Sequence, residues 1–262
     1  MGFLVTGNDD SHVLRATFDR VAEQYDNARP VAPAEVFDDL VALAGLTPGA
    51  QLLEIGCGTG QATLPLAERG FGILAVELGA QLAEVARRKL AAFPRVEIVT
   101  SSFEEWDPGD ARFDAVVSFN AFHWIDPDVR FAKPAALLRD GGALAVLGSR
   151  HVEHDSVDPV WLALEKDEAI WEPPLHLDDV RDRSTEFKDG GHFRAVTRKT
   201  YVWDTTYTAD AYVALLATIS RYTSLDARAR TELFERIHGR IEAAGGTVTP
   251  TTYAVLYVAE RA

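Results

Sequence analysis

Between Ala50 and Ser149 the chain alternates short apolar runs with segments of helical periodicity. A glycine-containing turn follows most runs, which span residues 51–55, 73–78, 96–100, 115–119 and 143–147. After the second run, Leu82, Val85 and Leu90 have the spacing of an amphipathic helix that packs on a sheet. This alternation predicts βαβ units, and therefore an α/β fold with a mostly parallel sheet and helices on both faces.

The segments on either side of this block have different patterns. Apolar residues at three- and four-residue steps, among them Phe18 and Val21, predict a helical segment that is interrupted at Arg29 and Pro30. We expect a single domain over residues 1–262, made of a helical cap (11–46), a ligand-binding core (50–149), a partly helical insertion or lid (150–194) and C-terminal strands (195–262) with two inserted helices (210–219 and 227–244) and a last β segment (247–259).

Composition and charge exclude several classes of protein. Hydrophobic residues make up 47% and charged residues 25% of the 262 residues, which is typical of a globular protein and excludes general disorder. The net charge of −14 repels phosphates, so we expect no nucleic-acid partner. No apolar run is long enough to cross a bilayer, and Cys57 is the single cysteine. We therefore expect a soluble, cytoplasmic protein without a membrane partner.

A glycine loop follows the first predicted strand. Gly56, Gly58 and Gly60 alternate with other residues directly before a predicted helix, where a ligand could approach the main chain closely. The dinucleotide fingerprint would need Gly or Ala at position 61 or 63, where Gln61 and Thr63 stand. The phosphate-binding pattern that ends in Gly-Lys-Ser/Thr is also absent. The loop therefore indicates a ligand other than NAD or ATP.

Polar residues follow the other predicted strands. Glu54 and Glu77 lie at the ends of the first and second strands, and Ser102 and Asn120 follow the third and fourth. In open α/β sheets ligands bind outside the carboxyl ends of the strands, so these four residues should converge on one crevice. Glu77 follows Gly60 by 17 residues, where a carboxylate can accept bonds from both hydroxyls of a ribose.

The motifs together resemble those of a known family. Glu54-x-Gly56-x-Gly58-x-Gly60, Ala75-Val76-Glu77 and the stretches 113–118 and 137–142 are similar to successive motifs of class I S-adenosylmethionine-dependent methyltransferases. Residues 25–33 and 121–124 resemble the type 11 small-molecule branch, which includes trans-aconitate methyltransferase. The resemblance implies a Rossmann-like fold and S-adenosylmethionine as cofactor. A crevice rimmed by two carboxylates also suits a sulfonium cation, which has no pyrophosphate.

The resemblance also implies a set of cofactor contacts. The glycine loop would face the methionine part, Glu77 the ribose, and Ser102 with Phe103 the adenine. Two residues of the N-terminal segment, Tyr25 and Arg29, would close over the cofactor. The residues implied for cofactor binding are Tyr25, Arg29, Glu54, Gly56, Cys57, Gly58, Gly60, Glu77, Leu78, Ser102, Phe103 and Asn120.

Candidates for the methyl acceptor's side of the site are fewer. His123 follows the fourth strand and is the candidate catalytic residue, either as a general base or as part of the acceptor pocket's lining. We expect His151 and His154 to lie in a solvated loop and expect no metal site. Trp161 and Trp171 belong either to a lid over an apolar acceptor or to plain packing of the insertion.

The sequence thus predicts methyl transfer to a small molecule through a carboxylate, hydroxyl or carbon nucleophile. The Asp/Asn-Pro-Pro-Tyr/Phe motif of methyltransferases that act on nucleic-acid amino groups is absent at residues 120–123. One alternative is a protein that binds S-adenosylmethionine without transferring its methyl group. Another is an NAD-dependent enzyme. The oligomeric state stays open, with a homodimer as one alternative.

Overall fold

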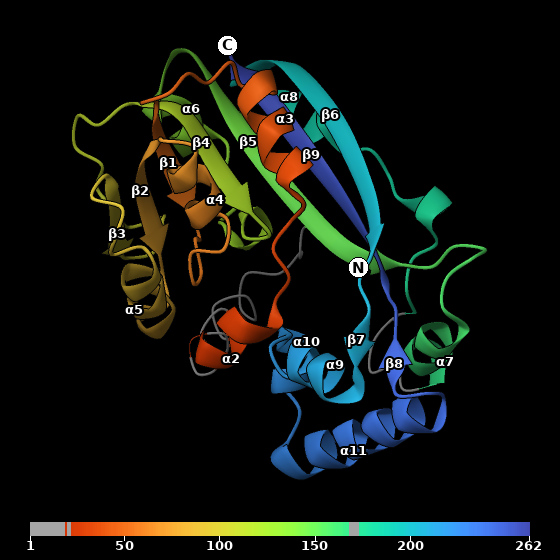
Figure 1. Ribbon diagram of the computed structural model, residues 1–262. Helices are drawn as coiled ribbons and strands as arrows, with labels where there is room; N and C mark the ends of the chain where they lie inside the picture. Colours follow the sequence, from red (N-terminus) through yellow and green to blue (C-terminus); the bar gives the residue numbers. More distant parts are fainter. Residues whose placement is uncertain (1–18, 20–21, 168–172) are drawn as a thin grey trace.

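The computed structural model describes Asp19 and residues 22–167 and 173–262. The strands of its main sheet are β1 (Gln51–Ile55), β2 (Gly72–Glu77), β3 (Val96–Thr100), β4 (Phe113–Phe119), β5 (Leu138–Val152), β6 (Phe193–Asp204) and β9 (Thr251–Arg261). They lie in the order β3-β2-β1-β4-β5-β9-β6 (Figure 1). Strands β1 to β5 are parallel, whereas β9 is antiparallel to both β5 and β6. The predicted mostly parallel sheet is confirmed.

Helices cover both faces of the sheet because successive residues of each strand point to opposite sides. On one face Leu52 of β1 packs in a buried cluster that also contains residues of α3 (Ala34–Leu43), α4 (Thr63–Glu68) and α5 (Ala80–Lys89). On the other face its neighbour Leu53 packs in a cluster with residues of α6 (Ala132–Leu137) and α8 (Ser184–Lys188). The predicted amphipathic helix after β2 is α5, and its Leu82 and Val85 are buried.

A separate helical unit lies below the sheet in Figure 1. It contains α7 (Pro159–Asp167), α9 (Ala209–Leu216), α10 (Ser220–Thr223), α11 (Ala227–Ala243) and a small sheet of β7 (Tyr207–Thr208) and β8 (Thr247–Val248). Helix α2 (Ala22–Ala28) packs against α9. Trp161 is fully buried in this unit, and its indole N–H donates to the Tyr212 hydroxyl over 3.0 Å. Of the two alternatives for Trp161, the structure therefore supports packing.

The structure corrects two predictions for the C-terminal half. Strand β5 does not end at residue 147, because Ser149 and His151 continue its ladder with Ala254 and Thr252 of β9. The expectation of a solvated loop is therefore wrong for His151. His154 does lie in the loop after β5, but it is half-buried, and its Nε2 lies 2.9 Å from the Thr251 hydroxyl.

The last predicted β segment is divided. Strands β8 and β9 stand in place of one continuous strand, since residues 249 and 250 lie between them and Pro250 has no N–H for a ladder bond. The predicted insertion is partly helical, with α7, the short 3-10 helix η2 (Leu177–Asp179) and α8. Residues 11–18, 20, 21 and Trp171 lie outside the described residues, so the predictions for them stay predictions.

Two kinds of feature are absent from the described residues. None of the described helices is long and apolar enough to cross a membrane. In the same part of the chain, no group of three or more His, Cys, Asp or Glu side chains is arranged to hold a metal ion.

Candidate active site

The glycine loop joins β1 to α4 at the carboxyl end of the sheet. Gly56, Gly58 and Gly60 have φ angles of +70°, +56° and +80°, in the left-handed region that favours glycine. A Cβ atom on Gly56 would lie 2.5 Å from the Cβ of Ala121, so a side chain there would collide with the segment after β4. At Gly58 the nearest atom, Cε1 of Tyr25, would lie 3.8 Å away and leave room. Gly56 is therefore the glycine on which the close approach of the two segments depends.

Glu77, at the end of β2, holds the glycine loop in place. Its Oε2 accepts a hydrogen bond from the Gly58 N–H and its Oε1 accepts one from the Gly79 N–H, both at 2.8 Å. Burial raises the pKa of this carboxyl group, and the two backbone N–H groups partly oppose the rise. A carboxylate has about four acceptor positions, so two bonds leave capacity for a ligand's hydroxyls.

Glu54 is a buried carboxyl group in the middle of the site, with an exposed fraction of 1%. Neither of its carboxyl oxygens has a hydrogen-bond partner among the residues that the structure describes. Burial raises the pKa of Glu54 to about 7, and the nearby charge of Glu77 adds to the rise. A buried acid of this kind is stabilised when a cation or a hydrogen-bond donor comes close.

Two adjoining cavities open at the carboxyl ends of β1 and β4. The first cavity, of about 300 Å³, extends from the glycine loop past Glu77 to Phe103 and Trp124. The second cavity, of about 370 Å³, extends from the same loop to the lower part of β5 and to α10. Residues that line both cavities are Tyr25, Arg29, Gly56, Gly58, Phe119, Asn120, Ser149 and Ile219. A ligand in one cavity would therefore lie beside a ligand in the other.

Most of the residues implied for cofactor binding lie along the first cavity. They are Tyr25, Arg29, Gly56, Gly58, Glu77, Leu78, Ser102, Phe103 and Asn120. Glu54 and Cys57 line the second cavity instead, and Gly60 is not among the lining residues of either. A Cβ on Gly60 would lie 3.0 Å from the Leu90 side chain, so this glycine serves the packing of the loop against the segment after α5.

Arg29 joins the N-terminal segment to the helical unit below the sheet. Its Nε donates to the Thr218 hydroxyl over 2.9 Å, and its Nη2 donates to the Thr218 carbonyl over 3.1 Å. The guanidinium also lies 5.1 Å from the centre of the Tyr25 ring, within the range of a cation–π contact. These contacts hold two segments, far apart in the sequence, over the glycine loop.

Asn120 shapes the wall that both cavities share. It has a φ of +56°, which is uncommon for a residue other than glycine. Its Oδ1 accepts hydrogen bonds from the N–H (2.7 Å) and the hydroxyl (3.1 Å) of Ser149. The side-chain oxygen of Asn120 is therefore engaged in joining the end of β4 to β5.

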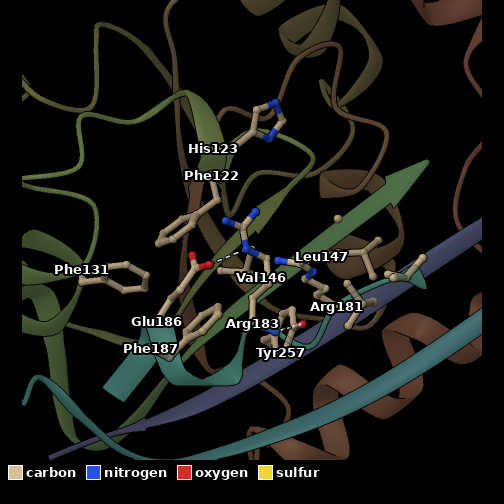
Figure 2. Close-up of a pocket in the computed structure, with 13 residues that line it drawn as sticks. Phe122, His123, Phe131, Val146, Leu147, Arg181, Arg183, Glu186, Phe187 and Tyr257 are labelled. Atoms are coloured by element: carbon tan, nitrogen blue, oxygen red, sulfur yellow. Dashed lines mark hydrogen bonds and ion pairs between the residues drawn. The ribbon is translucent and has the colours of Figure 1, made fainter. Parts of the chain in front are cut away.

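His123 lies on the short 3-10 helix η1 (Phe122–Trp124), with its ring centre 4.8 Å from that of Trp124. It lines the first cavity and also a small cavity of about 50 Å³ on the far face of β5, but it is not among the residues of the second cavity. Figure 2 shows its ring directed away from the ion pair of Arg183 and Glu186 in the small cavity. Pockets for organic ligands usually measure about 300–1,000 Å³, so the small cavity does not fit one.

Four further charged or polar residues of the second cavity were not expected from the sequence: Arg150, His151, Glu165 and Arg221. Burial lowers the pKa of His151 to about 4, and the positive charges of Arg221 and Arg29 add to the effect. His151 is therefore neutral near pH 7. The signal that could have revealed it is the two-residue step from Leu147 through Ser149 to His151, which extends the face of β5 into the cavity.

Comparisons with known proteins agree with this architecture. Residues 52–142 match a family model described as a methyltransferase domain. An uncharacterized methyltransferase of Mycobacterium tuberculosis is 30% identical over 224 residues, which cover 86% of this chain and 85% of the relative. Among solved structures, a putative type II methyltransferase from Anaeromyxobacter dehalogenans has a TM-score of 0.62 and 24% identity. The matched region covers 89% of this chain and 97% of the chain of that structure.

A second solved structure was determined with a product-like ligand. It is a methyltransferase from Geobacter sulfurreducens in complex with S-adenosyl-L-homocysteine, with a TM-score of 0.52, 14% identity and coverage of 89% of this chain and 93% of its own. At such identities these two structures establish the fold alone. Together with the relative from Mycobacterium and the family model, they show that the chain belongs to the class I S-adenosylmethionine-dependent methyltransferases.

Glu54 gives a prediction for cofactor binding. With a pKa of about 7, the carboxyl group is about half protonated at pH 7 in the free protein. A nearby cofactor cation favours the ionised form, so binding should release about half a proton per site at pH 7. Calorimetry in phosphate and in Tris buffer should give different binding enthalpies, and Glu54→Gln should remove the difference. Equal enthalpies for the native chain in both buffers would contradict the prediction.

Proposed function

We propose that the protein transfers the methyl group of S-adenosylmethionine, held in the first cavity, to a small molecule held in the second. The observation that carries this proposal is the shared wall, where Gly56, Gly58 and Tyr25 line both cavities. A displacement at a methyl group requires its two reactants in contact and in line, and two adjoining cavities meet this requirement.

The residues of the first cavity fit the cofactor. Gly56 and Gly58 line it with main chain rather than side chains, and Glu77 keeps acceptor capacity for the ribose hydroxyls. In the adjoining second cavity, the carboxyl group of Glu54 has no hydrogen-bond partner within the described part of the chain and suits a cationic group nearby. When bound, the cofactor supplies an electrophilic methyl group on a positively charged sulfur.

The residues of this chain position the reactants and exclude water. Glu77 and the glycine loop orient the cofactor, while Tyr25 and Arg29 cover it and hold α2 against the segment after α9. Reactions of this kind depend chiefly on orientation and on a dry site. A general base is needed only where the nucleophile must lose a proton.

Size and charge support a small-molecule acceptor. A volume of about 370 Å³ is within the usual range for organic ligands. The net charge of −14 and the absence of the Pro-Pro motif after β4 argue against nucleic acid.

Residues 25–33 and 121–124 support the type 11 branch as the nearer resemblance. A single cysteine is consistent with the cytoplasm as the place of action.

In this proposal the chain acts as one domain. Residues 50–149 hold the cofactor, the segment 22–46 covers it, and the later segments supply the remaining walls of the second cavity. Arg150, His151 and Glu165 come from the predicted insertion, and Leu215 and Arg221 from the C-terminal part.

The test is the release of S-adenosylhomocysteine from S-adenosylmethionine in the presence of a metabolite mixture. We expect release with the mixture, a methylated product detectable by mass spectrometry, and release at least tenfold lower without the mixture. Tight binding of S-adenosylmethionine with no product from any mixture would favour the alternative of a binding protein that transfers no methyl group. Tight binding of NADH would favour an NAD-dependent enzyme.

His123 gives a second prediction for the reaction. Because His123 does not line the second cavity, we expect His123→Asn to lower turnover by less than about tenfold. General-base catalysis contributes roughly 100-fold or more, so the two roles are distinguishable in steady-state kinetics. A loss of 100-fold or more in turnover, with unchanged affinity for S-adenosylmethionine, would restore His123 as the base.

A further inference from the structure

The second cavity is rich in arginine although the chain as a whole is acidic. Arg29, Arg150 and Arg221 line it together with the neutral His151. Its carboxyl groups are Glu165 and Glu54, and the raised pKa of Glu54, about 7, leaves that group about half protonated at pH 7. The guanidinium groups therefore exceed the carboxylates in this cavity, which is the reverse of the balance of the whole chain.

The ion pair with Glu165 does not use up the donors of Arg221. Glu165 Oε2 lies 3.2 Å from Nη2 of Arg221, and Glu165 Oε1 also accepts from the Tyr212 hydroxyl at 3.2 Å. The Nε of Arg221 is buried and has no hydrogen-bond partner within the residues that the structure describes. A guanidinium has five N–H donors in a planar fork, which suits a carboxylate or a similar oxyanion. Arg221 therefore has donor capacity left for a ligand.

Another part of the cavity is apolar. The lining residues there include Phe37, Phe119, Trp203, Leu215 and Ile219. A purely polar anion would leave these side chains in contact with water, whereas an aromatic or acyl group would bury them. The lining thus combines a cationic part with an apolar part.

We propose that the methyl acceptor is an amphipathic anion, whose oxyanion group binds Arg221 and whose aromatic or acyl body packs against Phe119 and Trp203. This inference rests on the proposed function, because it assigns the second cavity to the acceptor. Burial is the main cause of the low pKa of His151, and the positive charges of Arg221 and Arg29 lower it further. The same positive charges favour a negative ligand. The other charged or titratable groups that line the cavity are Arg150 on β5, Glu165 on α7 and Glu54 on β1.

The test uses binding rather than turnover. The full chain is first saturated with S-adenosylhomocysteine and is then titrated in a calorimeter with cinnamate, octanoate and their primary amides. We expect at least one acid to bind tenfold or more tightly than its amide, because charged hydrogen bonds to arginine are lost in the amide. Arg221→Gln should abolish the preference, and Arg221→Lys should retain part of it.

A matched control is Arg228→Gln on α11, which removes an arginine that is also paired with a glutamate, Glu232, but is exposed. It should bind acids and amides as the native chain does. Equal affinity for each acid and its amide, no binding of either, or a preference that survives Arg221→Gln would overturn the inference. If Arg221→Gln no longer binds S-adenosylhomocysteine, the acids and amides are compared on Arg150→Gln instead. That variant should also lose the preference for acids over amides.

The two proposals fail separately in this experiment. A native chain that binds no S-adenosylhomocysteine overturns both of them. A native chain that prefers acids, but methylates no acceptor in the metabolite test, contradicts the proposed function alone. Methylation confined to neutral acceptors contradicts the inference alone.

Discussion

Glu77→Gln is expected to weaken the binding of S-adenosylmethionine by at least tenfold and up to roughly 100-fold. Each hydrogen bond to a charged group contributes about 1.5–3 kcal/mol, and about 1.4 kcal/mol corresponds to a tenfold change in affinity. The substitution removes the charge and also replaces one acceptor oxygen by an NH₂ group. That group cannot accept a hydrogen bond, so one of the two backbone N–H groups, that of Gly58 in the glycine loop or that of Gly79 after β2, loses its bond to Glu77.

The same bonds predict an effect on stability that the sequence alone did not indicate. The structure gives the buried carboxyl group of Glu77 two backbone partners. Leaving a buried donor without a partner costs about 1–3 kcal/mol, which lowers the unfolding temperature by roughly 3–10 °C in a chain of this size. Calorimetric titration and thermal unfolding measure the two effects.

Glu84→Gln is the control for the loss of one negative charge. Glu84 lies on α5, is exposed, and pairs loosely with Arg87 at 3.6 Å. It should leave both the affinity and the unfolding temperature within error of the native values. An affinity of Glu77→Gln equal to that of the native chain would remove Glu77 from the cofactor site.

Gly56→Ala should have the largest effect on stability among single substitutions in the loop. The new Cβ would lie 2.5 Å from the Cβ of Ala121, so the loop or the segment after β4 must move. Overpacking of this kind costs about 1–3 kcal/mol, and a left-handed backbone adds about 1 kcal/mol for a residue with a Cβ. We expect a fall in unfolding temperature of roughly 5–15 °C and a loss of cofactor affinity of tenfold or more.

Gly45→Ala separates the cost of overpacking from the cost of a left-handed backbone. Gly45 has a φ of +60°, similar to that of Gly56, but a Cβ there would have no atom within 4 Å. It should therefore show the backbone cost alone, about 1 kcal/mol, with normal cofactor affinity. Equal effects of Gly45→Ala and Gly56→Ala on stability would show that the approach of Ala121 does not matter.

The sequence predicted best two short strands of the parallel part of the sheet. The boundaries of β1 and β3 agree with the predicted residues 51–55 and 96–100, because each is a short apolar run between turn residues. Strand β5 was predicted too short. Its second half carries Ser149 to His151 along the second cavity, and polar residues on a strand that faces a cavity look like a loop in the sequence.

The candidate site also contains some residues that could be predicted from the sequence and others that could not. Residues of the glycine loop and at the strand ends could be predicted, because the order of motifs along the chain determines their place at the sheet's edge. Arg221 could not be predicted, since it reaches the site from a helix far along the chain, and no local pattern marks it. Thr218 could not be predicted either, because only the fold brings it close enough to accept hydrogen bonds from Arg29.

The position of β9 has a consequence for how the chain is synthesised. Strand β6 has its ladder with β9 alone in the main sheet, and β9 is the last of these strands in the sequence. When β6 leaves the ribosome, the strand beside which it must lie has not yet been made. The edge of β5, which is made before β6, also stays unpaired until β9 is made, although its ladder with β9 spans residues 143–152. Completion of this half of the sheet therefore waits for β9, and until then two strand edges are open to pairing with other chains.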